Sequence, residues 1–261
     1  MNTACQYRAR ETRCTLLMRF AVLTLATLTC TTVHAGQAHV AVASNFAAPM
    51  KQLVTQFEQA SGHTLTLSTG ATGKFYAQIR HGAPFDVLLA ADDETPARLL
   101  HEGDAVQSQT YAIGRLALWS ERPGFVDGSD AVLRQNRFQR LAIANARLAP
   151  YGSAAVEVLT RLKLLDSVQG KFVIGENIAQ TYQFVASGNA ELGFVALSQV
   201  MQDGKLTGGS VWQVPAALHA PIRQDAALLK RGEHNAAARA LLDYLNSPPA
   251  VAIIRSYGYE R

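Results

Sequence analysis

The sequence is poor in cysteine, in long apolar runs and in excess charge of one sign. All three cysteines precede residue 31, so the rest of the chain can form no disulfide, thiolate metal site or cysteine nucleophile. No apolar stretch reaches the ~20 residues that a membrane-spanning helix needs. Residues 1–35 carry four arginines and one glutamate, which leaves 20 basic and 19 acidic side chains in the remainder. This balance gives little support to nucleic-acid binding, which requires a clustered basic face.

Motifs of several enzyme classes are missing or incomplete. Gly70–Lys74 resembles a phosphate-binding loop, but Ser68 and Phe75 stand where that loop requires glycine and a serine or threonine. The sequence has no Gly-x-Ser-x-Gly elbow and no His-Glu-x-x-His, and its histidines are scattered without the spacing of metal ligands. The residues therefore favour binding over catalysis, and we expect no cofactor.

What is present at the N-terminus predicts an export signal. The polar, arginine-bearing segment 1–19 is followed by the uncharged, mostly apolar run Phe20–Cys30 and by small residues that end at Ala35. This order is typical of a cleavable signal peptide, with cleavage after Ala35 or after Ala38. Cys30 follows a poor lipidation sequence, so a free periplasmic protein is the better interpretation. We predict a signal peptide over residues 1–35.

The remaining chain alternates between strand and helix patterns. At 261 residues and 48% hydrophobic content it can bury the cores of one large or two medium domains. Apolar runs with strand periodicity alternate with segments whose apolar residues recur at helical spacing, which predicts an α/β fold with mixed, mostly parallel sheets. Predicted strands are 39–43, 64–68, 85–90, 113–119, 141–144, 172–174, 192–196 and 211–214, and the main predicted helices are 46–61, 153–164, 178–186, 235–245 and 249–256.

Small polar residues recur directly after the predicted strands. Ser44 and Asn45 follow the first strand, and Thr72 lies between two glycines after the second. Tyr151 follows the strand near residue 143, and Ile178 lies at the start of the helix near residue 180. In α/β sheets ligands bind beyond the carboxyl ends of the strands, where helix N-termini offer free N–H donors. Any one of these residues could be an ordinary helix cap. Their recurrence at successive turns favours a neutral cage for a small anion.

Two charged features near these turns have simpler interpretations. Asp92 and Asp93 are adjacent, and capping of the following helix explains them better than a shared site. Lys74 could add long-range attraction for an anion, but a solvated helix lysine is equally consistent with the sequence.

A set of segments carries a family resemblance. They are Ala43–Phe46, Ser68–Ile79, Gly82–Val87, Ala90–Asp92, Leu141–Asn145, Ala149–Gly152, Gly193–Ser198 and Tyr257–Tyr259. With them the chain, from about His39 to its C-terminus, resembles the periplasmic molybdate-binding proteins of ABC importers, which have the type II periplasmic-binding-protein fold.

The resemblance implies two α/β lobes joined by two crossover strands. Lobe 1 would comprise residues 39–115 plus 222–261, and lobe 2 residues 116–221. The crossings are expected at Gly114–Ser120 and Ile222–Leu229.

The resemblance also implies a site for the oxyanion between the lobes. Ser44 and Thr72 match its hydroxyl-bearing positions, Asn45 a position that contributes in one branch of the family, and Tyr151 and Ile178 positions whose backbone N–H groups reach the ligand. Ala196 stands where one branch carries a tyrosine hydroxyl, so that hydrogen bond is absent, and Asn45 is the residue expected to compensate.

We therefore predict an exported, monomeric, non-enzymatic receptor that binds molybdate, and tungstate as well, and delivers it to an ABC permease. The only metal would be the molybdenum of the bound oxyanion, held through Ser44, Thr72, Tyr151 and Ile178. The rival interpretations are a receptor for another small oxyanion or anionic metabolite, an exported hydrolase with Ser44 or Ser153 as nucleophile, and a regulatory effector lobe of the same fold class.

Overall fold

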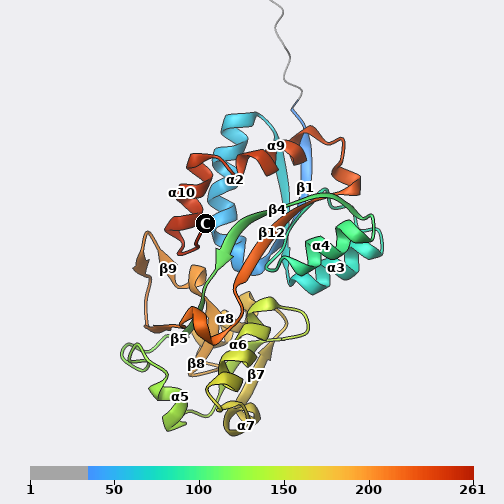
Figure 1. Cartoon of the computed structure of the whole chain (residues 1–261). Coiled ribbons are helices and arrows are strands. Elements are labelled where there is room, and N and C mark those ends of the chain that lie inside the picture. Colours follow the sequence, from blue (N-terminus) through green and yellow to red (C-terminus); the bar gives the residue numbers. More distant parts are fainter. Residues whose placement is uncertain (1–34) are drawn as a thin grey trace, which may run out of the picture. The chain divides into compact units, whose positions relative to one another are not determined.

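Two five-stranded sheets organise the part of the chain that the structure, a computed structural model, describes, residues 35–261 (Figure 1). The predicted signal peptide, 1–35, lies outside the described residues except for Ala35. The first sheet has the strand order β2-β1-β3-β12-β4 and the second β11-β5-β8-β6-β7. Each sheet carries its own helices, which makes two lobes. The fold is the predicted α/β type with mixed sheets.

The first sheet is covered by helices on both faces. β1 runs parallel to β2 and β3, whereas β12 is antiparallel to both of its neighbours. Alternate residues of β1 enter different cores: Val40 and Val42 pack beneath α2, α9 and α10, and Ala41 packs on the side of α3 and α4. The elements of this lobe are β1 Gln37–Ala43, η1 Ser44–Phe46, α2 Ala47–Ser61, β2 Thr64–Gly70, α3 Thr72–Arg80, β3 Val87–Leu89, α4 Glu94–His101, β4 Ala105–Gly114, β12 Ile222–Leu229, η5 Lys230–Gly232, α9 Ala236–Tyr244 and α10 Pro248–Ser256.

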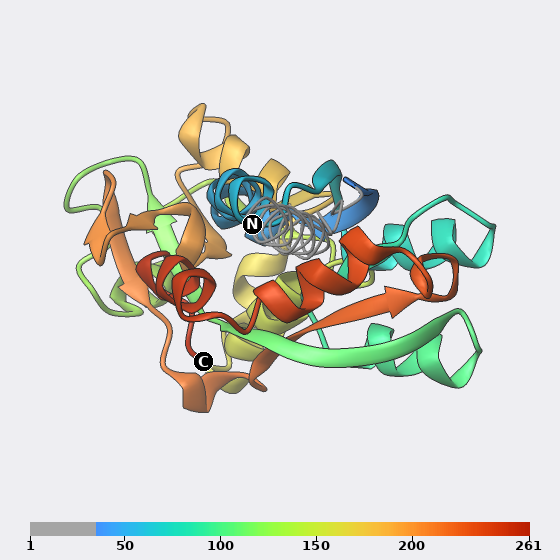
Figure 2. The same ribbon diagram turned by 90° about the horizontal axis from the view of Figure 1, so that it is seen from above.

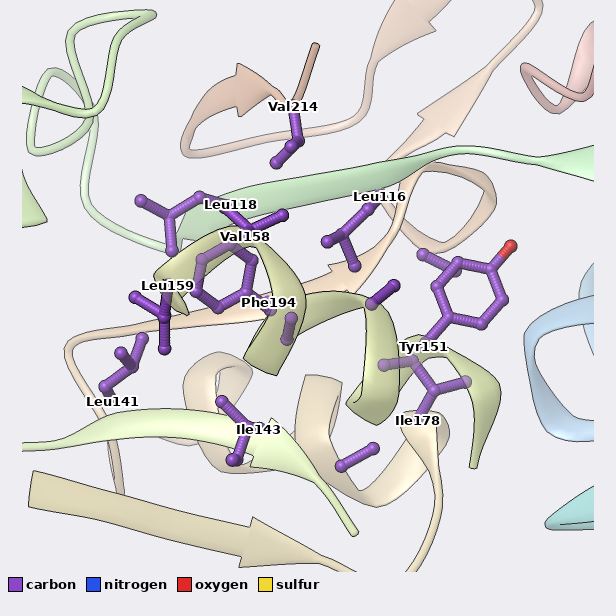
Figure 3. Packing of buried hydrophobic residues seen from close by; sticks show 14 of the residues in the cluster. Leu116, Leu118, Leu141, Ile143, Tyr151, Val158, Leu159, Ile178, Phe194 and Val214 are labelled. Atoms are coloured by element: carbon purple, nitrogen blue, oxygen red, sulfur yellow. The ribbon is translucent and has the colours of Figure 1, made fainter. Parts of the chain in front are cut away.

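The second sheet has α6 on one face and α8 on the other. Figure 3 shows the α6 side, where Tyr151, Val158 and Leu159 meet apolar side chains of β5, β6 and β8. The α8 side holds Val185 against Trp119. The elements of this lobe are β5 Leu116–Ser120, α5 Ala131–Gln135, β6 Leu141–Ala144, α6 Pro150–Arg161, α7 Leu165–Val168, η2 Gln169–Lys171, β7 Phe172–Gly175, α8 Ile178–Ala186, β8 Leu192–Ala196, η3 Leu197–Gln199, β9 Met201–Gln202, β10 Lys205–Leu206, β11 Ser210–Gln213 and η4 Ala216–Leu218.

The chain crosses between the lobes at two places, of which the first lies within the predicted crossing Gly114–Ser120 and the second differs from the prediction. The predicted strand 113–119 is two strands. β4 ends at Gly114 in the first sheet, β5 begins at Leu116 in the second sheet, and only Arg115 lies between them. The second predicted crossing, Ile222–Leu229, is wrong because these residues form β12 within the first sheet, so the chain crosses between β11 and β12. Figure 2 shows β4 and β12 side by side, and their backbone pairing extends to the crossings themselves.

Most of the other predicted elements are confirmed. The strands at 141–144 and 192–196 and the helix at 178–186 have the predicted ends. The predicted lobe limits, 39–115 plus 222–261 and 116–221, stay a prediction; the strands of the two sheets divide in the same places. Within residues 35–261 no helix combines the length and the apolar character that crossing a membrane would require.

Candidate functional site

The five residues predicted to bind an anion all line one small cavity between the lobes. It holds about 190 Å³ of empty space, part of it continuous with solvent. Five chain segments form it, each of which follows the carboxyl end of a parallel strand. The lining residues are Ala43, Ser44, Asn45, Gly70, Ala71, Thr72, Ala91, Ala149, Pro150, Tyr151, Asn177 and Ile178.

Lobe 1 contributes two hydroxyl side chains. Ser44 begins η1 immediately after β1, and Thr72 is the first residue of α3 after β2. The parallel pairing of β1 with β2 ends at Ala43 and Gly70, which brings the two hydroxyls to the same edge of the sheet. Thr72 Oγ1 accepts the backbone N–H of Ala91 at 3.0 Å. Because a hydroxyl has one proton to donate, this contact leaves that proton available to the cavity.

Lobe 2 contributes backbone N–H groups at two helix N-termini. Pro150 and Tyr151 are the first two residues of α6, and Ile178 is the first residue of α8. The Asn177 side chain accepts the N–H groups of Ala179 and Gln180, the second and third residues of α8, at 3.0 Å each. Within the described chain, the N–H groups of Tyr151 and Ile178 donate to no protein atom. Both are therefore free to donate to a ligand, and the helix dipoles favour an anion there.

The cavity lining carries no formal charge at neutral pH. It contains no lysine, arginine, histidine or carboxylate. Tyr151 is its only titratable side chain, and burial raises the pKa of its hydroxyl well above the usual range. A set of neutral donors can satisfy an anion that only accepts hydrogen bonds, without a counter-charge.

The Asn45 side chain has a different environment from the one predicted. Asn45 is 2% exposed, and its amide nitrogen donates inward, to Gln224 Oε1 at 2.9 Å and to the Tyr259 hydroxyl at 3.0 Å. Both amide protons are thus used within the protein, so the side chain has no free donor for an anion. Ala196 is fully buried and does not line the cavity. The amide therefore does not replace the missing tyrosine hydroxyl; only the Asn45 backbone remains available.

The two lobes meet around the cavity. The Gly73 N–H donates to the Leu148 carbonyl at 3.0 Å, and Lys74 Nζ lies 2.6 Å from Glu176 Oε2. A Cβ atom at Gly73 would lie 3.1 Å from Leu148 Cα, so any other residue would push the two backbones slightly apart here. These contacts join the two lobes beside the cavity. They also show that Lys74 forms an ion pair between the lobes.

Of the two acidic residues beside the cavity, Asp92 caps a helix, as predicted, whereas Asp93 does not. Asp92 Oδ1 accepts the Thr95 N–H at 2.9 Å at the start of α4, and burial raises the pKa of the Asp92 carboxyl. Asp93 lies 3.6 Å from an Arg223 nitrogen at the surface. Neither carboxylate lines the anion cavity.

The contacts of the two candidate nucleophiles argue against a hydrolase. No histidine or carboxylate lines the cavity beside Ser44. The Ser153 hydroxyl donates to the Ala146 carbonyl at 2.7 Å, which is a structural contact at the start of α6. Neither serine has the base that a nucleophilic hydroxyl requires. Among residues 35–261 there is also no cluster of three His, Cys, Asp or Glu side chains that could hold a metal ion.

Sequence reasoning missed the polar side chains beneath the cavity. Gln224, Tyr259 and Ser198 surround Asn45, and Tyr111 joins them through Gln224. Tyr259 and Ser198 lie in segments that carried the family resemblance, but nothing in that pattern gave them a role. Gln224 carried no signal, because a single glutamine in a strand is usually exposed.

Known proteins of one family are similar to this chain over most of its length. The family model described as bacterial extracellular solute-binding protein matches residues 38–260. The molybdate-binding protein ModA of Azotobacter vinelandii is 55% identical over 245 residues, 93% of this chain and 97% of the relative. The ModA of Rhodobacter capsulatus is 48% identical over 227 residues, covering 86% and 88%.

A solved structure shows the same fold. The periplasmic molybdate-binding protein of Azotobacter vinelandii superimposes with a TM-score of 0.83 at 41% identity, over 86% of this chain and 99% of that one. The match of the family model over nearly all of the described residues, together with these relatives, leads to one conclusion: the chain belongs to the bacterial extracellular solute-binding protein family.

Proposed function

We propose that this protein binds molybdate in the cavity between its lobes and delivers it to an ABC permease. The two relatives at 55% and 48% identity are molybdate-binding proteins, and this chain covers most of each. Their activity is binding and not catalysis. The cavity lining supports the same activity here, since it lacks any acid, base or activated nucleophile.

The observation that carries the proposal is the convergence of four neutral donors on one cavity. Ser44 and Thr72 supply hydroxyls, and the start of α6 and the start of α8 supply backbone N–H groups. A tetrahedral divalent oxyanion presents four oxygens that only accept hydrogen bonds at neutral pH. Each charge-assisted hydrogen bond contributes about 1.5–3 kcal/mol. Four converging donors therefore suffice for tight binding without a buried cation.

The same chemistry predicts which anions bind. A protonated oxyanion brings an O–H that would find no acceptor among these donors, so it should bind more weakly. Sulfate is smaller than molybdate and cannot contact both lobes equally well. Tungstate has nearly the size of molybdate, and we propose that it binds as well.

Delivery requires that the loaded form be distinguishable from the empty form. Closure of the lobes on the anion creates a surface that the open form lacks, and a permease can recognise it. We propose that the chain acts as a periplasmic monomer after removal of residues 1–35. The arginine-bearing segment and apolar run at the N-terminus support export.

Calorimetric titration of residues 36–261 with molybdate, tungstate, sulfate and phosphate tests the proposal. We expect one site per chain for molybdate and for tungstate, and at least about 100-fold weaker binding of sulfate, a difference of about 2.7 kcal/mol. Binding of sulfate or phosphate alone would replace molybdate by another oxyanion as the ligand. Absence of heat with all four anions would refute the anion receptor.

A further inference from the structure

A buried group of polar side chains lies directly beneath the anion cavity and spans the two lobes. Asn45 and Gln224 come from lobe 1, and the Tyr151 hydroxyl comes from lobe 2. Gln224 lies on β12 and is completely buried. Buried polar side chains are costly unless each is hydrogen-bonded, so this group has to be explained.

Gln224 is the branching point of the group. Its Oε1 accepts from Asn45 Nδ2 at 2.9 Å and from the Tyr111 hydroxyl at 3.0 Å. Its Nε2 donates to the Tyr151 hydroxyl at 3.1 Å. The Gln224 amide thus accepts from lobe 1 and donates to lobe 2 at the same time. An ionised glutamate would lack the donor, and methionine would lack both functions.

The hydrogen bonds from Asn45 through Gln224 to Tyr151 form a bridge, and this bridge connects two residues that line the anion cavity. The backbone N–H of Tyr151 lies at the start of α6, and Gln224 holds the hydroxyl at the end of the Tyr151 side chain. Asn45 lies in η1 beside Ser44, and Gln224 holds its amide. Through one side chain, lobe 1 therefore contacts the segment of lobe 2 that carries a candidate ligand donor.

The bridge also passes through the crossing between the lobes. A Cβ atom at Gly114, the last residue of β4, would lie 2.2 Å from the Tyr151 hydroxyl and 2.5 Å from Gln224 Nε2. Any other residue at this position would displace the bridge. Because Gly114 is separated from β5 by a single residue, the bridge lies where the lobes must rotate when they open.

We propose that Gln224 is a positioning residue for the oxyanion. It does not touch the ligand; its amide aligns Tyr151 with Asn45 when the lobes close, and so stabilises the closed form. Opening would let water reach the Tyr151 hydroxyl and the Asn45 amide, whereas closure buries both. Loss of the Gln224 amide then penalises the closed form alone, and affinity falls. The inference rests on the proposed function, because it concerns the affinity of that site.

The test combines Gln224→Met, Gln224→Glu, Tyr151→Phe and the double variant Gln224→Met/Tyr151→Phe. We measure the Kd for molybdate by calorimetry, the dissociation rate by stopped flow and the Tm of the ligand-free protein. Gln224→Met should weaken binding about 20-fold, mainly through faster dissociation, and Gln224→Glu should weaken it similarly. Tyr151→Phe should weaken it less, and the double variant should bind no more weakly than Gln224→Met, because both changes break the same bridge.

Gln109→Met is the matched control. Gln109 lies on the neighbouring strand β4, and its amide donates to the Leu242 carbonyl far from the cavity. This control should lower the ligand-free Tm without changing the Kd. A merely structural role of Gln224 would give the same pattern, a lower Tm with an unchanged Kd, and would overturn the inference. Additive losses in the double variant would also overturn it.

The outcome for the parent protein separates this inference from the proposed function. A parent protein that binds molybdate, together with an unchanged Kd in Gln224→Met, overturns the positioning role alone. A parent protein that binds no molybdate overturns both.

Discussion

The two lobes contribute donors of different kinds to the same cavity. Lobe 1 supplies the side-chain hydroxyls of Ser44 and Thr72, whereas lobe 2 supplies the backbone N–H groups of Tyr151 and Ile178. A hydroxyl can be removed by a single substitution. A backbone N–H remains whatever the side chain, and it can only be displaced by moving the helix that carries it.

This difference predicts how each half of the site responds to change. On the lobe 1 side, binding should depend on residue type, because the donors are side chains. On the lobe 2 side, binding should depend on where α6 and α8 begin, because each helix start sets the direction of its free N–H. Substitutions that test the two halves therefore have to act differently, by deletion in one lobe and by displacement in the other.

The largest effect is expected from displacing the start of α6. A Cβ atom at Gly152 would lie 2.3 Å from the Ala144 carbonyl oxygen, a backbone atom that cannot move without β6. Gly152→Ala should therefore shift α6 and its Tyr151 N–H, and weaken molybdate binding at least about 100-fold in calorimetry.

Gly170→Ala is the control for this substitution, because a Cβ atom there meets no atom within 4 Å. It should bind like the parent protein. Unchanged affinity in a folded Gly152→Ala variant would show that the N–H at the start of α6 does not bind the anion.

Deleting the Thr72 hydroxyl should have the next largest effect. Thr72→Val keeps the shape of the side chain but removes the donor to the anion, and it also leaves the buried Ala91 N–H without its acceptor. We expect about 30-fold weaker binding, since an unsatisfied buried donor and a lost charge-assisted hydrogen bond both contribute. Thr72→Ser should keep most of the affinity. Equal binding by the valine and parent proteins would remove Thr72 from the site.

Ser44→Ala should weaken binding less, by about 10-fold, because it removes one hydrogen bond without leaving a known buried partner unpaired. Ser153→Ala is the matched control, since the Ser153 hydroxyl donates to Ala146 and does not line the cavity. Calorimetry should show parent-like affinity for the control. Equal losses of affinity in Ser44→Ala and Ser153→Ala would show that the Ser44 hydroxyl has no special role in binding the anion.

The ion pair between the lobes should matter little. Lys74 and Glu176 are 44% and 65% exposed, and such exposed pairs stabilise a structure by about 1 kcal/mol at most. Lys74→Gln should change the Kd less than about 5-fold, and the change should shrink further in 0.5 M salt. A larger loss that persists in high salt would mean that a charged side chain contributes directly to anion binding.

The smallest effect is expected from pH. Tyr151 is the only titratable group in the cavity lining, and burial raises its pKa, so its hydroxyl stays neutral as pH rises toward and beyond its ordinary value of 10. Molybdate affinity should therefore be constant within about twofold between pH 6 and pH 9, because no lining group changes its charge. A titration step in this range would reveal an ionisable side chain in the site.

The sequence predicted what depends on local pattern. Strand β1, helix α2, the glycine that ends α2, and the helix start at Ile178 follow from periodicity and caps, and the structure has them. The gathering of Ser44 and Thr72 followed from their positions after parallel strands. Patterns of this kind act through neighbours in sequence, so they can be read without knowing the tertiary contacts.

The sequence did not predict what depends on contacts between distant segments. The two amide protons of Asn45 are taken by Gln224 and Tyr259, which are 179 and 214 residues away, and no local pattern reports such partners. The crossing at Arg115 lies within the predicted crossing Gly114–Ser120, but the break between β4 and β5 was missed because the apolar residues on either side read as one strand. Residues 106–110 of β4 are exposed or half-buried and β4 sits at the edge of its sheet, so its apolar signal is weak.

A crystal structure of the molybdate-soaked protein, with anomalous scattering at the molybdenum edge, tests the central claim most directly. We predict one molybdenum peak in the cavity, with ligand oxygens about 2.7–3.1 Å from Ser44 Oγ, Thr72 Oγ1 and the backbone nitrogens of Tyr151 and Ile178. A peak elsewhere, or oxygens paired with lysine or arginine side chains, would contradict the neutral cage built from both lobes.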